Sequence, residues 1–286
     1  MFDEKEHAVI GYYHRRESAW GYRLLLRGCR HFGYYPAGRR FLSMAGAQRL
    51  MEDRLGAALA LPPGSLVLDA GCGEGWVARR LSRRFGLRVE GVDLLEVSID
   101  RARRRVADAA VGFRVGSYAR LPFLDDTFAG LYTMETLVHA TDHRRALAEF
   151  HRVLAPGGRL VLVEYSMPAR DAMTAAQRAV FDAVNRGSGM HSFPEFTHGR
   201  FPAMLAEAGF ACDQVSDVMP HIVPMLRRLH HLGYLPYAVA RSLGRGHRLV
   251  NAMAGVELYR LRDLIRYNIV VGHKPARLHV PGPLGR

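Results

Sequence analysis

The chain of 286 residues predicts an α/β fold, a doubly wound and mostly parallel seven-stranded sheet, and three observations support this. Short apolar runs alternate with helical patterns from about residue 64 onward. This alternation is typical of parallel strands joined by crossover helices. A glycine-rich turn follows the first run, and acidic residues follow two later runs, at the strand ends where open α/β sheets bind ligands.

Apolar runs and helical spacing locate the individual elements. The expected strands are residues 66–70, 88–92, 111–115, 131–134, 159–164, 211–218 and 268–272. Apolar residues at helical spacing predict helices over residues 76–85, 97–109 and 144–154. The sequence Ala155-Pro156-Gly157-Gly158 is expected to stop the last of these helices before the next strand.

Three regions lie outside the alternating pattern. Residues 1–63 are rich in aromatic residues and arginine and predict an N-terminal helical cap. Within the main domain, residues 64–276, two segments are too long for simple connections and predict helical insertions at 168–208 and 219–265. We expect the cap and insertions to contact substrate, with helical packing alone as the alternative. The tail, residues 277–286, is expected to be flexible.

Composition excludes several classes of protein. The hydrophobic fraction of 49% and the charged fraction of 23% fit an ordinary globular protein. No apolar run approaches the roughly 20 residues of a membrane span, and the first ten residues resemble no secretory signal, so we expect a cytoplasmic protein that is not integral to a membrane. Cys29, Cys72 and Cys212 are far apart in the chain, which predicts reduced thiols and no metal site.

The net charge of +13 does not by itself predict a nucleic-acid partner. Only Lys5 and Lys274 are lysines, and the arginines are spread along the chain without a dense basic run. We therefore expect a small-molecule substrate, apolar or anionic, and no nucleic acid. The sequence leaves a homo-oligomer open. A basic amphipathic stretch at residues 221–248 leaves peripheral membrane association open as well.

The strongest local signal is the sequence VLDAGCGEG at residues 67–75. Its glycines allow a sharp turn after the strand and a close approach of backbone amides to a ligand. The glycine spacing differs from the G-x-G-x-x-G pattern of dinucleotide sites. In addition, the carboxylate of Asp69 would repel a pyrophosphate but attract a cation.

Acids at two further strand ends agree with this interpretation. Asp93 ends the second strand, about 20 residues past the glycines, where an acid accepts hydrogen bonds from both hydroxyls of a ribose. Glu135 and Thr136 follow the fourth strand. Each acid alone would be an ordinary strand end, but together they predict a pocket for a cationic cofactor that carries a ribose.

From Leu66 to Gly272 the sequence resembles class I S-adenosylmethionine-dependent methyltransferases. The matching stretches are VLDAGCGEG, GVDL, LPFLDDTFAGLYTMETLVHA and HRVLAPGGRLVLVEY. The resemblance implies a Rossmann-like fold, S-adenosyl-L-methionine as cofactor, and an adenine contact near Ser117, where many members carry an aspartate. The cofactor residues expected on these grounds are Asp69, Gly71, Cys72, Gly73, Gly75, Asp93, Leu94, Ser117, Tyr118, Glu135 and Thr136.

Shorter motifs suggest what is methylated. Residues 135–140, followed by Glu164 and Tyr165, look like the sterol C-methyltransferase branch and its smaller bacterial relatives that methylate prenyl and terpenoid substrates. The aromatic segments at residues 11–13 and 31–35 are similar to segments that cap the pocket in those enzymes. The resemblance implies C-methylation of a prenyl diphosphate, a terpenoid or a similar unsaturated molecule. Arginines of the cap that could pair with a diphosphate are Arg15, Arg16, Arg23 and Arg27.

Methylation of an alkene gives the candidate residues plausible roles. Attack of the π bond on the sulfonium methyl group leaves a carbocation, which needs aromatic faces and a base. The catalytic candidates are Glu164 and His139, for which a solvated strand end and simple packing are the alternatives. The substrate-binding candidates are Tyr12, Tyr13, Tyr34, Tyr35, Tyr165, His191, Phe193 and Phe196, for which core packing is the alternative.

Two other functions stay open on sequence alone. One is O- or N-methylation of a small metabolite, in which Glu164 or His139 would deprotonate the nucleophile. The other is a non-enzymatic scaffold that binds a partner. The intact glycines, Asp69 and Asp93 argue against the second.

Overall fold

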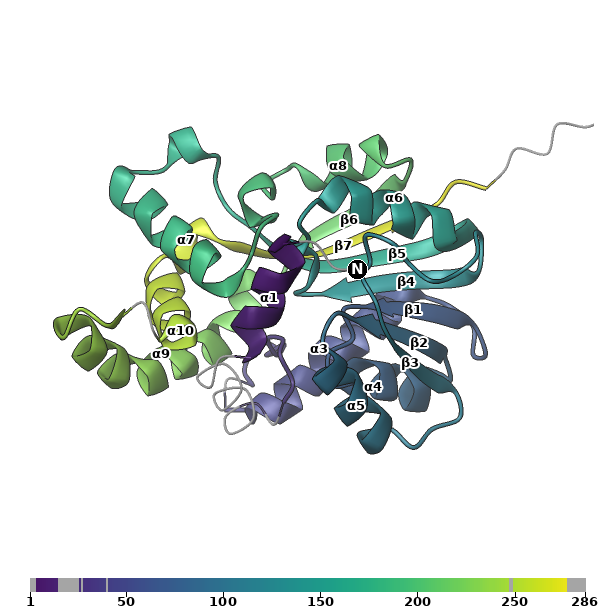
Figure 1. Cartoon of the computed structure of the whole chain (residues 1–286), viewed down its shortest axis with the longest axis horizontal. Helices are drawn as coiled ribbons and strands as arrows, with labels where there is room; N and C mark the ends of the chain where they lie inside the picture. Colours follow the sequence, from purple (N-terminus) through teal and green to yellow (C-terminus); the bar gives the residue numbers. More distant parts are fainter. Residues whose placement is uncertain (1–3, 15–25, 27, 40, 247–248, 277–286) are drawn as a thin grey trace, which may run out of the picture.

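The computed structural model describes residues 4–14, 26, 28–39, 41–246 and 249–276, and its centre is a seven-stranded sheet (Figure 1). The strand order is β3-β2-β1-β4-β5-β7-β6. The strands are β1 (Leu66–Ala70), β2 (Arg88–Asp93), β3 (Val111–Val115), β4 (Phe128–Met134), β5 (Leu154–Ser166), β6 (Ala211–Asp217) and β7 (Arg266–His273). Among these strands, β7 alone runs in the direction opposite to the other six. The predicted mostly parallel, seven-stranded sheet is confirmed.

Helices cover both faces of this sheet (Figure 1). On one face lie α3 (Met44–Leu59), α4 (Trp76–Phe85) and α5 (Glu96–Arg105), and on the other lie α6 (His143–Val153) and α8 (Phe201–Glu207). The central strands are continuous apolar runs because both of their faces are buried. The helix ends before residues 155–158 as expected, at Val153, but the next strand starts earlier than expected, because β5 begins at Leu154 beside Phe128 of β4.

The predicted N-terminal cap divides into two structural parts. Helix α3 packs against α4 and the sheet, and its Met51, Leu55 and Leu59 are fully buried in the main core. Ser43 begins this helix by accepting a hydrogen bond from the backbone N–H of Gly46. The other part, α1 (Glu4–His14) and the loop at residues 28–36, lies over the edge of the sheet where the site forms.

The long insertions form a separate group of helices beside the sheet (Figure 1). Its members are α7 (Ala175–Ser188), α9 (Met219–Ser242) and α10 (Val250–Arg260), and α9 and α10 pack along each other. Short 3₁₀ turns join the elements: η1 (Leu137–His139), η2 (Arg170–Ala172), η3 (Phe193–Glu195) and η5 (Arg262–Leu264). Helix α1 lies between the sheet and this helical group in Figure 1. The tail at 277–286 lies outside the described residues.

Within the described part of the chain, no helix combines the length and apolar character that crossing a bilayer requires.

Candidate active site

The glycine-rich turn at the end of β1 is held tightly against two other strand ends. The backbone N–H groups of Gly71 and Cys72 both donate to the carbonyl of Val92, at 2.7 and 3.0 Å. Gly71 has a φ of +89°, and a Cβ atom there would overlap the side chain of Thr136. Glycine at this position therefore allows the turn to lie directly against the segment that follows β4.

Asp93, at the end of β2, is fixed by two backbone amides. Its Oδ2 accepts from Gly73 and its Oδ1 from Leu95, both at 2.9 Å. Burial raises the pKa of Asp93, and these two N–H donors oppose the rise. Each oxygen keeps lone-pair capacity for a further donor, which is the arrangement that the vicinal hydroxyls of a ribose require.

Asp69 presents a carboxylate oxygen that lacks a hydrogen bond. The side chain is 3% exposed, and Oδ2 has no hydrogen-bond partner among the described residues. Burial raises the pKa of Asp69 to about 7. The hydroxyl of Tyr132 and the charge of His31 oppose this rise, and a cationic group in the adjoining pocket would stabilise the buried carboxylate further.

These groups line one pocket, which we call the cofactor pocket. Of the eleven predicted cofactor residues, the following nine line it: Asp69, Gly71, Cys72, Gly73, Asp93, Leu94, Tyr118, Glu135 and Thr136. Gly75 instead begins α4, with a φ of +76°, and packs against Phe113. Ser117 lies outside the lining as well. Residues that the sequence analysis missed are Val9, Gly28, Arg30, His31, Glu74, Trp76, Val77, Leu95 and Met134.

Ser117 is paired with a carboxylate from the N-terminal helix. Its hydroxyl donates to Oε1 of Glu6 on α1 at 2.5 Å, and Glu6 is 8% exposed. Helix α1 thus brings an acid to the position where the resembling family often carries an aspartate. Such a contact between residues 111 positions apart leaves no pattern in the sequence.

A second and larger cavity, the inner chamber, lies beside the cofactor pocket. Its volume is about 430 Å³, and its walls are mostly apolar side chains from α9, α10, η3 and the N-terminal loop. Four of the predicted substrate residues line it: Tyr12, Tyr13, Tyr165 and Phe193. The sequence analysis missed most of its walls, among them Phe32, Met190, Met219, Ile222, Met225, Leu226, Leu229, Leu258 and Ile265.

The structure places the other four predicted substrate residues outside the linings of both cavities. Tyr34 stacks on His221 at 4.3 Å between ring centroids. Tyr35 is buried, and its hydroxyl accepts from Arg228 at 3.2 Å. Phe196 is buried in the core, and His191 is exposed. The two tyrosines attach the N-terminal loop to α9, so they support the chamber without facing it.

His139 lies where the two cavities meet and lines both. Its Nδ1 lies 3.1 Å from the carbonyl of Gly189, and its Nε2 lies 3.1 Å from the hydroxyl of Tyr13. Because a carbonyl can only accept, Nδ1 carries the proton and Nε2 accepts from Tyr13. Burial lowers the pKa of His139 to about 4, so the ring is neutral near pH 7.

Glu135 also lines both cavities but is fully engaged by neighbouring donors. Its carboxylate accepts from the backbone N–H of Phe32 at 2.6 Å, from the hydroxyl of Tyr267 at 2.5 Å, and from the hydroxyl of Tyr165. Burial raises its pKa, and these donors oppose the rise. Its φ of +56° is unusual for a residue other than glycine, which indicates a backbone held in place by the site.

Glu164 lies beneath the site and lines neither cavity. Its Oε1 accepts from the hydroxyl of Thr133 at 3.0 Å and from the amides of Thr136 and Leu137 at 3.1 and 2.8 Å. Burial raises the pKa of Glu164 to about 8. The expectation of direct contact between Glu164 and substrate does not match this geometry, because its carboxylate faces the backbone after β4 and holds it in position.

Comparisons with known proteins agree with this site. The family described as "Methyltransferase domain" matches residues 67–158. The S-adenosyl-L-methionine-dependent Diels-Alderase iccD of Talaromyces variabilis is 35% identical over 280 residues, which cover 94% of this chain and 96% of that protein. The sterol 24-C-methyltransferase erg-4 of Neurospora crassa is 27% identical over 253 residues, 84% of this chain and 64% of that protein.

Solved structures share the fold. Geranyl diphosphate C-methyltransferase from Streptomyces coelicolor A3(2) superposes with a TM-score of 0.71 at 19% identity, covering 95% of this chain and 98% of that one. This chain therefore belongs to the S-adenosylmethionine-dependent methyltransferases, and its cofactor is S-adenosyl-L-methionine. The buried carboxylate of Asp69, which lines the pocket, and the amide-fixed Asp93 fit the two ends of that molecule, its cationic methionine part and its ribose.

Proposed function

We propose that this enzyme methylates a carbon atom of an extended, apolar and unsaturated small molecule of terpenoid or polyene type. The observation that carries the proposal is the apolar inner chamber, which shares Tyr13, Arg30, His31, Glu135 and His139 with the cofactor pocket. A molecule in the chamber would lie beside the cofactor, so the methyl group could be transferred directly, with no water between the two. The apolar walls would bind it mainly through burial of hydrophobic surface.

The cofactor pocket would hold S-adenosyl-L-methionine by its charged and hydroxyl groups. Asp69 would pair with the cationic methionine part, and Asp93 would accept hydrogen bonds from the ribose. The bound cofactor supplies an electrophilic methyl group. The chain contributes proximity and orientation, because both ligands are fixed against the same five residues.

Aromatic rings of the chamber would stabilise the positive charge that forms on the substrate. Tyr12 and Tyr13 of α1 meet edge to face, with centroids 4.8 Å apart, and Phe193 meets Tyr165 with centroids 6.0 Å apart. All four line the chamber. The negative faces of such rings attract a cation, and they do so most effectively where water is excluded.

His139 would accept the proton that the substrate cation loses. Its Nε2 is unprotonated in the neutral ring, and the hydroxyl of Tyr13 holds the ring in place. A pKa of about 4 makes a weak base, yet a carbocation is so strong an acid that a weak base suffices. The same base is poorly matched to an alcohol or an amine, which disfavours O- or N-methylation that requires deprotonation.

The walls of the chamber give little support for a diphosphate group. Arg30 is the one arginine among the described residues that line the chamber. The cap arginines that the sequence suggested for this role, Arg15, Arg16, Arg23 and Arg27, lie outside the described residues. We therefore propose that the chamber recognises the apolar part of the substrate, and we assign no site to a diphosphate.

A [4+2] cycloaddition within a bound polyene is the second candidate. It is favoured by the 35% identity with a Diels-Alderase over nearly the whole of both chains. In this reaction three π bonds become two σ bonds and one π bond, no atom is gained or lost, and the sulfonium keeps its methyl group. The cycloaddition needs no base. It is therefore compatible with a Glu135 that already accepts several hydrogen bonds and with a weakly basic His139.

One product screen separates these candidates. The protein is incubated with cofactor carrying a ¹³C-labelled methyl group and with a panel of linear polyenes, terpenoids, phenols and amines. C-methylation predicts a hydrocarbon product that gains one labelled methylene unit, with release of demethylated cofactor. Cycloaddition predicts an isomer of unchanged mass and no loss of cofactor. Labelled methyl groups found only on phenols or amines would contradict both candidates.

A further inference from the structure

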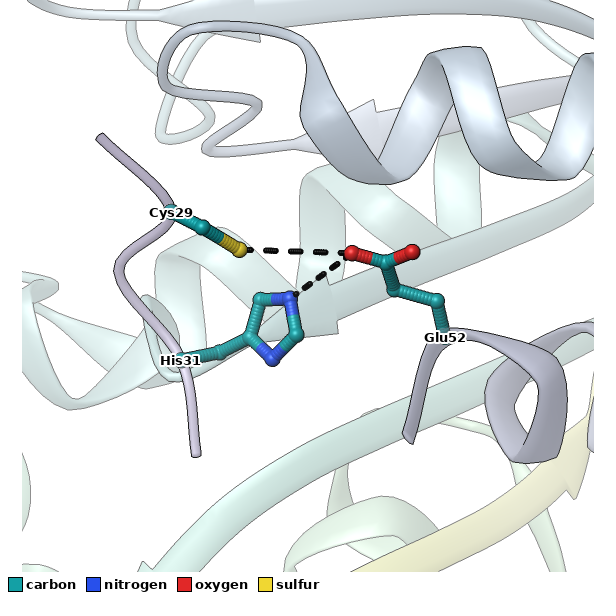
Figure 2. A group of neighbouring side chains, drawn as sticks. All are labelled: Cys29, His31 and Glu52. Atoms are coloured by element: carbon teal, nitrogen blue, oxygen red, sulfur yellow. Dashed lines mark hydrogen bonds and ion pairs between the residues drawn. The ribbon is translucent and has the colours of Figure 1, made fainter. Parts of the chain in front are cut away.

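Three chemically different side chains meet beneath the N-terminal loop. Cys29 and His31 lie on this loop, and Glu52 comes from α3 (Figure 2). The thiol of Cys29 and Nε2 of His31 both point to Oε1 of Glu52, at 3.9 and 3.3 Å. All three residues are buried, and one ligand atom from each lies within 4.8 Å of the others. The sequence predicted no metal site because its three cysteines are far apart in the chain, whereas His31 and Glu52 join Cys29 only in the folded protein.

The separations are close to those around a small tetrahedral ion. Zinc bonds of about 2.0 Å to nitrogen and oxygen and about 2.3 Å to sulfur place ligand atoms roughly 3.3–3.7 Å apart. The distance between His31 and Glu52 falls in this range, and that between Cys29 and Glu52 exceeds it slightly. Thiolate, imidazole and carboxylate together are a donor set that suits Zn²⁺ and disfavours Mg²⁺ or Ca²⁺.

The second ring nitrogen of His31 is oriented as in a metal-bound histidine. Nδ1 lies 2.9 Å from the carbonyl of Phe32 and donates to it, which leaves Nε2 unprotonated in the neutral ring. Gln48 donates to the carbonyl of His31 at 2.9 Å and so fixes the loop that carries both Cys29 and His31. A protonated ring instead donates from Nε2 to Glu52 at 3.3 Å, and although burial lowers the pKa of His31, Cys29 and Glu52 raise it well above its ordinary value. A zinc ion would take the place of this proton, which is released to solvent.

The surroundings of His31 are rich in negative charge. Besides Glu52, the carboxyls of Asp69 and Glu135 are close enough to interact electrostatically with His31. His31 lines both the cofactor pocket and the inner chamber, whereas Cys29 and Glu52 line neither. An ion held by the three side chains would thus lie next to the wall that His31 contributes to the two cavities.

We propose that Cys29, His31 and Glu52 bind one zinc ion, with an open fourth position for an oxygen atom of the chamber ligand, such as a carbonyl. Binding displaces the thiol proton of Cys29 to solvent. Three protein ligands with one open position are typical of zinc sites that contact substrate. The ion would fix an oxygen-bearing substrate beside the cofactor and withdraw electrons from it.

Metal content of the full-length protein tests this site without any turnover, so its failure leaves the proposed function untouched. After incubation with zinc and gel filtration, elemental analysis should find about one zinc ion per chain. The cobalt form should show a near-ultraviolet charge-transfer band from the thiolate. Cys29→Ser should lose the band and most of the metal, while Cys212→Ser, which alters a half-buried thiol on β6, should keep both.

Three results would overturn the proposal. The first is a wild-type protein that retains no zinc. The second is metal content unchanged in Cys29→Ser, a substitution that replaces a single side-chain atom and so preserves the fold even if His31→Ala does not. The third is a cobalt spectrum that azide leaves unchanged, because an open position predicts a shift of the ligand-field bands.

Discussion

The cofactor pocket and the inner chamber share five lining residues, yet they are built in opposite ways. The pocket consists of strand ends and turns, where backbone amides fix carboxylates such as Asp93. The chamber is formed by helix faces, and apolar side chains from α9 and α10 line its open space. In the cofactor pocket, individual polar groups bind individual atoms of the ligand. The chamber, in contrast, binds its ligand through the fit of its shape. Substitutions in the pocket should therefore lower cofactor affinity, whereas substitutions in the chamber should lower turnover of the substrate.

Helix α1 connects the two regions. Glu6 pairs with Ser117 at the cofactor side, while Tyr12 donates to Asn251 of α10 at 2.6 Å on the chamber side. Tyr13, between them, contacts His139 at the junction. This helix therefore contacts residues of both regions.

The largest expected effect is on the cofactor side. Asp93→Ala removes the acceptor for the ribose hydroxyls and for two backbone amides. Because charge-assisted hydrogen bonds contribute about 1.5–3 kcal/mol each, the affinity for S-adenosyl-L-methionine should fall about 100-fold in calorimetry. Asp213→Asn, on β6 beside Arg159, is the control and should bind normally. Equal affinity in both variants would remove Asp93 from the cofactor site.

The chamber should respond to volume and leave cofactor binding unchanged. Gly255 of α10 lines it, and a Cβ atom there would make only ordinary contact with Leu229, at 3.6 Å. Gly255→Ala should therefore be tolerated, whereas Gly255→Leu should fill space and lower kcat/KM for an extended substrate about tenfold. Cofactor affinity should stay the same in both variants. Turnover unchanged in Gly255→Leu, with a normal thermal midpoint, would show that substrate binds elsewhere.

Glu6 should have a smaller effect on the cofactor pocket. We expect it to take part in adenine recognition together with Ser117, so Glu6→Gln should weaken cofactor affinity about threefold to tenfold. The same substitution should leave the affinity for methionine alone unchanged. An equal loss for both ligands would mean that Glu6 only stabilises α1.

Glu164 should affect stability and its dependence on pH. Its pKa is about 8 in the folded protein, above the ordinary value of 4.5, so the folded state retains a proton that the unfolded chain releases. This contribution to stability is complete below about pH 4.5 and is lost as pH rises toward 8. In urea unfolding between about pH 5 and pH 8, Glu164→Gln should lose less stability than the wild type. Glu207→Gln, at an exposed ion pair, should follow the wild type.

The two regions also differ in how far the sequence predicts them. Asp69, Gly71 and Asp93 were predictable because their spacing along the chain is set by strands and turns that lie next to each other in the sheet. The chamber walls were not, since Ile222 and Leu258 look like any apolar positions of a helix until α9 and α10 are placed in space. Contacts such as Glu6 with Ser117 depend on the same tertiary placement. Glu164 was misjudged because a strand-end acid can turn toward the backbone as well as toward a ligand.

We expect the methyl group of the bound cofactor to face the junction of the two cavities, at Tyr13 and His139. The most direct measurement is a ¹³C-filtered nuclear Overhauser experiment on the protein with methyl-labelled S-adenosyl-L-methionine. Cross-peaks are expected from the labelled methyl group to the ring protons of Tyr13 and His139. Cross-peaks confined to Trp76 and Val77, at the start of α4, would contradict this expectation.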